Sequence, residues 1–168
     1  MIDVAWYKDL WEYDPTTDQW TKKVDFPGEA RYLAVGFSIG DLGYVGTGQV
    51  ESGSNSADFW AYNPTIDQWT RVSPLGNNSY PAIERQQAVS FVIGDKAYVG
   101  TGKGEKKNLW ESDATTDRWT QKTDFGGGGR GSAIGFAMNG KGYIGTEYVN
   151  GVYQKDMWAY NPTTDSWT

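Results

Sequence analysis

Three arginines are the residues best placed to bind a charged ligand. Arg31, Arg85 and Arg130 each stand just before a short apolar stretch. A guanidinium group can hold a carboxylate or a phosphate through two parallel hydrogen bonds. A buried arginine must be paired, however, and sequence repeats that carry the same arginine also repeat its partner. We weigh an anion-binding site against a tie between repeats, and the repetition favours the tie.

Other reactive chemistry has few candidates. The 168-residue chain carries 21 Asp and Glu but no Cys and no His, which excludes thiolates and disulfides and argues against histidine triads and zinc sites. No carboxylate pair stands out as an acid–base couple, and the acidic DPTTD turns lack EF-hand spacing. The segments GDLGYVGTG and GGGGRG lack the Lys-Ser/Thr of a phosphate loop. The sequence predicts no catalytic residue, no metal and no cofactor.

The net charge and the hydropathy of the chain narrow the classes of partner that it can bind. The formal net charge is −6 and no long basic run is present, which argues against nucleic acid. No apolar run is long enough to cross a membrane, and the N-terminus is too polar for a signal peptide. We expect a soluble chain, and the alternative of a secreted or cell-surface parent protein stays open because the sequence does not name the compartment.

An internal repeat must build the elements that position these residues. A Trp phrase, DLWEYDPTTDQWT at 9–21, recurs with small changes at 58–70, 108–120 and 156–168. A second module, RYLAVGFSIGDLGYVGTG at 31–48, recurs at 85–102 and 130–147. Successive phrase tryptophans, Trp11, Trp60, Trp110 and Trp158, are spaced by 49, 50 and 48 residues.

Each module is predicted to form a β-hairpin. The second module carries Gly40-Asp41, Gly94-Asp95 or Asn139-Gly140 at its centre, and two-residue hairpin turns need such dipeptides. The Trp phrase carries Asp or Asn at the start of its turn, where the side chain can bond its own backbone. Each repeat therefore holds four short antiparallel strands, and no segment shows helical periodicity. The fold class is all-β.

Four-stranded repeats of this period resemble the kelch family of β-propellers. The resemblance covers nearly the whole chain. It rests on the three arginines, on Tyr44 and Tyr98 with their following glycines, and on the Tyr-Asx-Pro and Trp of the phrase. The chain departs from the family pattern in having Gly-Thr-Gly in place of a double glycine. In the third repeat, Glu147 also replaces the second glycine. In the third Trp phrase, Ser112 replaces the Tyr and Ala114 replaces the Pro. Kelch oxidases of the galactose oxidase type use copper held by histidines and a Tyr–Cys crosslink, so their activity does not carry over.

The strand count predicts a partial propeller of about three and a half blades. The half blade spans 9–24, and the full blades span about 31–72, 85–122 and 130–168. Closed propellers hold about 4–8 blades, and an open arc leaves aromatic faces uncovered. We expect either a piece of a longer propeller or a homodimer whose copies together equal about seven blades. The phrase tryptophans are expected to pack between blades.

Loops that differ between repeats are the expected binding surface. The resemblance places two sets of connections on one face: 49–57, 103–107 and 147–155 within repeats, and 25–30, 73–84 and 124–129 between repeats. Candidate anchors there are Trp6, Tyr80, Tyr148 and Tyr153, and loop packing is an equally good interpretation of each. If the arginines ring a central channel, they offer an anion-binding channel.

The function expected from these features is a non-catalytic binding or protein-interaction scaffold with a protein or glycan ligand. The first alternative is a carbohydrate-binding surface protein, because Tyr and Trp suit sugar faces. The second is a sugar hydrolase or isomerase that uses channel Asp or Glu. A purely structural repeat from an adhesin or fibre is the third.

Overall fold

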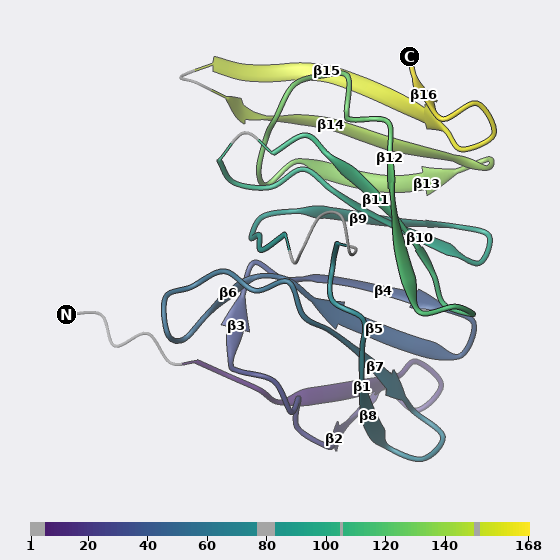
Figure 1. The fold of residues 1–168 in the computed structure, drawn as a ribbon. Helices are drawn as coiled ribbons and strands as arrows, with labels where there is room; N and C mark the ends of the chain where they lie inside the picture. Colours follow the sequence, from purple (N-terminus) through teal and green to yellow (C-terminus); the bar gives the residue numbers. More distant parts are fainter. Residues whose placement is uncertain (1–5, 77–82, 105, 150–151) are drawn as a thin grey trace.

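The computed structural model describes residues 6–76, 83–104, 106–149 and 152–168. These residues form sixteen β-strands and no helix, so the predicted all-β class is confirmed. The strands are grouped in three sheets of four strands and two sheets of two, and all pairs are antiparallel. Within the described residues these sheets follow one another as an open stack (Figure 1), and none of them closes a ring.

The strand bounds follow the repeats. The N-terminal hairpin is β1 (Leu10–Asp14) and β2 (Gln19–Lys23). The first sheet is β4 (Val35–Ile39), β5 (Leu42–Gly46), β7 (Phe59–Asn63) and β8 (Gln68–Val72). The second sheet is β9 (Val89–Ile93), β10 (Lys96–Gly100), β11 (Leu109–Asp113) and β12 (Arg118–Lys122). The third sheet is β13 (Ile134–Met138), β14 (Lys141–Val149), β15 (Val152–Asn161) and β16 (Ser166–Trp167).

Two loops predicted from the sequence are partly strand. The segment 49–57 contains β6 (Gln49–Val50), which pairs with β3 (Arg31–Tyr32) as a small separate sheet. The segment 147–155 extends β14 and β15, with a register shift between Gly145 and Glu147. In this ladder Tyr148 pairs with Tyr153, and Val149 pairs with Val152. Aromatic and β-branched residues of this kind favour strands. The prediction of a loop over all of 147–155 was therefore wrong.

The Trp phrase recurs because its polar residues make the same bonds in each sheet. Asp14, Asn63, Asp113 and Asn161 each accept the backbone N–H two residues further on, at 2.8–3.0 Å, which sets the turn. The turn's last Asp and the Trp that follows then bind the connecting segment that precedes the sheet. Asp67 accepts the Val24 N–H at 3.1 Å, and the Trp69 indole donates to the Val24 carbonyl at 3.3 Å.

The same two bonds recur along the stack. Ser73 is held by Asp117 and Trp119, and Thr123 is held by Asp165 and Trp167. The last three copies of the phrase thus fasten their own sheets to the chain that arrives from the previous one.

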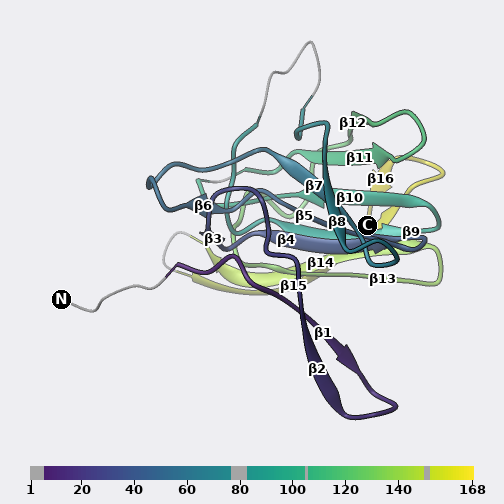
Figure 2. The ribbon, with the colours of Figure 1, turned by 90° about the horizontal axis from the view of Figure 1, so that it is seen from below.

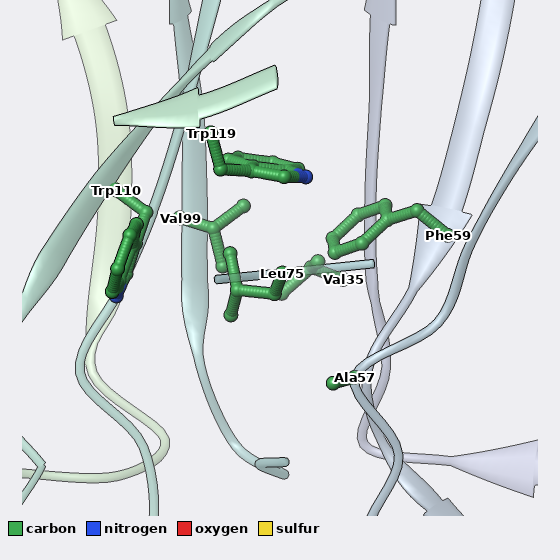
Figure 3. Close-up of a cluster of buried hydrophobic side chains, with 7 residues drawn as sticks. All are labelled: Val35, Ala57, Phe59, Leu75, Val99, Trp110 and Trp119. Atoms are coloured by element: carbon green, nitrogen blue, oxygen red, sulfur yellow. The ribbon is translucent and has the colours of Figure 1, made fainter. Parts of the chain in front are cut away.

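Two hydrophobic clusters fill the junctions between sheets. Between the first and second sheets (Figure 3), Val35 and Phe59 on one side meet Val99 and Trp119 on the other, and Leu75 lies between them. Between the second and third sheets, the cluster is Val89, Phe91, Tyr98, Leu109, Phe125, Ile144 and Tyr160. Burial of these side chains is the main source of stability, at about 25 cal/mol for each Å² of apolar surface.

The tryptophans behave as the sequence predicts only where a neighbouring sheet exists. Trp110 and Trp119 are buried, and Trp60 and Trp158 are partly buried. In the N-terminal hairpin, however, Trp11 and Trp20 are exposed. Figure 2 shows this hairpin projecting away from the stack, so its rings lack the second sheet that covers the others.

Adjacent sheets approach closely because one side of each junction carries glycine or a small residue. Val89 and Phe91 of β9 point at Gly135 and Gly142 of the third sheet. A Cβ added to Gly135 would lie 2.8 Å from the Cβ of Val89, which is closer than packed side chains allow. These glycines are needed for space, since neither has the positive φ that glycine alone accepts easily.

We predict that Gly135→Ala destabilises the fold by about 1–3 kcal/mol, because overpacking a filled junction forces the two sheets apart. Urea unfolding followed by tryptophan fluorescence measures the change. Ala137→Ser, at an exposed position of the same strand, is the matched control and should leave the unfolding midpoint unchanged. An unchanged midpoint for Gly135→Ala would contradict close packing at this junction.

Candidate functional site

Among the described residues, the connections between second and third strands and the segments that lead into β9 and β13 lie on one side of the stack, and the tight hairpin turns lie on the other (Figure 1). We call the first side the loop face and the second side the turn face. β3, β6 and the extended tip of β14 and β15 belong to the loop face. The arginines and the candidate aromatic anchors are placed relative to these two faces.

Arg31 and Arg130 form the same partly buried ion pair in two repeats. Arg31 donates to both carboxylate oxygens of Asp58, at 2.5 and 3.0 Å, and to the Thr47 carbonyl at 3.0 Å. Arg130 donates to both oxygens of Asp156, at 2.7 and 3.0 Å, and to the Thr146 carbonyl at 3.1 Å. This two-bond geometry is the strongest arrangement for a guanidinium and a carboxylate.

Each of these carboxylates also accepts the indole of the tryptophan two residues further on. Trp60 donates to Asp58 at 3.0 Å, and Trp158 donates to Asp156 at 2.9 Å. The guanidinium groups of Arg31 and Arg130 lie 4.7 and 4.8 Å from the ring centres of Phe26 and Phe125. Arginine, carboxylate and two rings therefore form one repeated unit.

The second repeat lacks the carboxylate. Arg85 is fully buried and donates to the Asn108 side chain and to the Thr101 carbonyl, both at 2.9 Å. Among the described residues it forms no ion pair. Burial lowers the pKa of Arg85 to about 10, so the guanidinium still carries its charge at neutral pH.

The hydrogen bonds of the two ion pairs also set the pKa values of Asp156 and Asp58. The bonds from Arg130 lower the pKa of Asp156 more than burial raises it, and the Trp158 indole adds to the effect. Burial alone would raise the pKa of Asp58, but hydrogen bonds from Arg31, Ser56 and Trp60 hold it below its ordinary value. Both carboxylates are therefore charged in the folded protein across the physiological range.

The three arginines donate to groups of their own repeats, so an anion would have to displace these bonds. A structural tie accounts for every arginine contact described above, but it joins parts of one repeat. The expected tie between repeats was therefore wrong. The anion-binding channel stays a prediction.

The candidate aromatic anchors do not converge. Trp6 is half-buried and packs edge-on against Tyr32, with ring centres 5.1 Å apart. Tyr153 is 78% exposed and lies on β15, at the other end of the stack. Tyr148 lies opposite Tyr153 in the β14–β15 ladder. Tyr80 is outside the described residues.

Tyr32 is a loop-face residue that sequence reasoning missed. Its ring is exposed between Trp6 and Gln49, and its hydroxyl donates to the Gln49 side chain. The available signal was its position, since the residue after the repeated arginine is Tyr32, Gln86 or Gly131 in the three repeats. Variation directly beside an invariant position marks a residue that the scaffold does not require.

The turn face carries a groove that the sequence did not suggest. Its volume is about 630 Å³, and Ile39, Tyr44 and Ala114 line it together with Asp41 and Asp95. Burial, with the charge of Asp117, raises the pKa of the Tyr44 hydroxyl, so this group remains a hydrogen-bond donor.

Beside the groove, the third Trp phrase lacks a Tyr that the fourth phrase has. At the second junction, Tyr98 and Tyr160 meet with ring centres 5.5 Å apart. Ser112 stands where Tyr160 stands in its own repeat, so Tyr44 has no such ring beside it. Ser112 lines a small cavity of about 20 Å³ that adjoins the groove.

Comparison with known proteins supports the fold alone. No family model matches the chain, and no curated protein matches it. A solved structure described as "Structure of YjhT" is similar, with a TM-score of 0.77 and 16% sequence identity. The match covers 96% of this chain and 51% of that chain, so the chain spans about half the length of YjhT.

Two further findings concern the described residues only. In the described part of the chain, no helix is long and apolar enough to cross a membrane. No group of three or more Asp or Glu side chains in the same part of the chain is placed to hold a metal ion.

We predict that Asp156→Asn lowers the free energy of unfolding by about 1–2 kcal/mol at neutral pH, because a charged partner of buried Arg130 is lost from a partly exposed site. The folded pKa of Asp156 is lowered, so its contribution is present above the ordinary aspartate value and is lost as pH falls through the folded value.

Urea titrations from pH 7 down to about pH 3 should therefore show the gap between wild type and Asp156→Asn closing. Asp95→Asn, in an exposed turn, is the control and should follow wild type throughout. A gap that stays constant with pH would rule out the charged pair as its source.

Proposed function

We propose that this chain is a kelch-type β-propeller segment that acts as a non-catalytic binding and protein-interaction scaffold and that self-associates to complete a ring. The half blade is 9–24 and the blades are about 31–72, 85–122 and 130–168. The hairpin and the three four-stranded sheets fall within these limits, which supports the blade assignment.

The observation that carries the proposal is the contrast between the constant scaffold and the varied loop face. The Arg–Asp–Trp unit occurs in two of the three repeats, the second repeat keeps the arginine with Asn108, and the turn bonds recur in all of them. The loop face instead bears exposed aromatic rings at Tyr32 and Tyr153, each present in one repeat only. Tyrosines of this kind are common anchors of protein interfaces, and loops on a rigid scaffold usually carry recognition.

The carboxylates support a binding role over an enzyme. Every described Asp whose pKa shifts, including Asp58 and Asp156, shifts downward through hydrogen bonds that build the fold. A general acid at neutral pH needs a raised pKa. These Asp residues are therefore committed to structure.

A glycan ligand is the second candidate, and the turn-face groove favours it. The groove offers one aromatic ring, Tyr44, and two carboxylates, Asp41 and Asp95. Its other lining residues are a mixture of apolar and polar side chains. Sugars bind well where hydroxyl groups meet acceptors beside an apolar surface.

Screening the purified chain against a displayed random-peptide library and a glycan array tests the proposal. We expect a peptide consensus whose binding weakens about tenfold in Tyr32→Ala or Tyr153→Ala, the usual cost of removing an aromatic anchor. Ile66→Ala, at an exposed apolar site on the turn face, should bind as wild type.

Peptide binding that survives both tyrosine changes would contradict a loop-face site. Glycan binding that is lost in Asp41→Asn or Asp95→Asn would instead support the turn-face groove.

A further inference from the structure

The junctions between sheets repeat one arrangement, and it is left half-made at each end of the stack. Val35, Val89 and Ile134 hold the same position in the first strands of the three sheets. Val35 is 5% exposed and Val89 is 4% exposed, because a following sheet covers them, whereas Ile134 is 54% exposed. Phe91 is buried by the third sheet, and its counterpart Phe136 is exposed.

The third strands show the same break in pattern. Phe59 and Leu109 are fully buried against the following sheet, and Met157 in the same position is 48% exposed. Met138 is exposed beside them. We call Ile134, Phe136, Met138 and Met157 the knob stripe.

The first sheet presents the opposite half of the junction. Gly36 and Gly43 hold the positions of Gly135 and Gly142, which receive Val89 and Phe91 in the second junction. A Cβ added at Gly43 would meet no atom within 4 Å, and one at Gly36 would meet only a backbone oxygen of its own sheet, 3.7 Å away. We call Gly36, Gly43 and the half-buried Val45 the glycine socket.

We infer that the knob stripe of one copy of this chain packs into the glycine socket of a second copy, and that two such contacts join two copies head to tail in a closed ring. The inference rests on the self-association in the proposed function and names its surfaces. The contact would copy the junction between β9 and the third sheet, so each partner already contains the geometry it needs.

The number of sheets fits a ring of two copies. Two copies bring six four-stranded sheets, and closed propellers hold about 4–8. A head-to-tail contact closes when the rotation between copies completes a circle, and otherwise it makes filaments. The N-terminal hairpin projects away from the stack (Figure 2) and leaves the socket open.

A partner of another sequence would need the same stripe of four apolar side chains at the same spacing. A second copy has that stripe by construction, which is why we assign it as the occupant. The exposed rings of the hairpin, Trp11 and Trp20, project away from the stack and are not part of this contact.

Complementation between two variants tests the inference. Phe136→Asp removes the knob, and Gly43→Trp fills the socket at a position where an added Cβ meets no atom within 4 Å. Ile134→Asp is a second knob variant, and Ile66→Asp is a control for loss of exposed apolar surface elsewhere. Circular dichroism checks that each variant is folded.

Sedimentation of wild type and of Ile66→Asp is expected to show dimers at micromolar concentration. Each knob or socket variant alone should be monomeric, with dimerisation at least about 30-fold weaker, since a central anchor is lost from every contact. An equal mixture of Phe136→Asp and Gly43→Trp should regain a heterodimer, because one intact knob then meets one intact socket.

Three outcomes would overturn the inference. A wild type that stays monomeric removes self-association from the proposed function too. Dimers that survive both changes place the contact elsewhere and leave self-association standing. Variants that are monomeric but fail to complement each other exclude a head-to-tail contact. Loop-face binding to peptides is measured separately and is unaffected by all three.

Discussion

The packing of large apolar side chains into a glycine-lined neighbouring sheet is the constraint on which the structure depends. Val89 and Phe91 can approach the third sheet closely only because Gly135 and Gly142 leave room for them. A four-stranded sheet alone exposes both faces, and stacking is what gives each one a core. The N-terminal hairpin shows the converse, since it makes its full ladder but keeps its rings in solvent.

Polar residues fix the order in which the sheets stack. The Trp phrase ties each sheet to the incoming chain, and the Arg–Asp pair ties the start of a sheet to its third strand. Arg85 shows how far this unit can vary, because Asn108 keeps one hydrogen bond while giving up the ion pair. With so many side chains committed to the scaffold, the loop face is the part that is free to differ between repeats, which is why we place recognition there.

Much of the fold could be predicted from the sequence, because period, turn dipeptides and the Asx turns are local signals. The extension of β14 and β15 could not, since strand length there depends on the pairing of the two strands with each other. The turn-face groove also escaped prediction. In the sequence, Ser112 is only a departure from the Tyr of the repeat. The structure shows that Ser112 and Tyr44 line a small cavity at the place of the absent ring. Among the aromatic anchors, Tyr32 was missed because exposure is decided by surrounding loops and not by residue type.

Native-state hydrogen exchange, resolved strand by strand, tests the central claim most directly. If packing between sheets holds the fold together, the amides of β9 and β10 should exchange only on global unfolding, because sheets lie on both sides of them. Those of β1 and β2 should exchange by local opening, although their hydrogen-bonded register matches that of β11 and β12. Equal protection of the hairpin and the second sheet would contradict the account, since it would show that strand pairing alone supplies the stability.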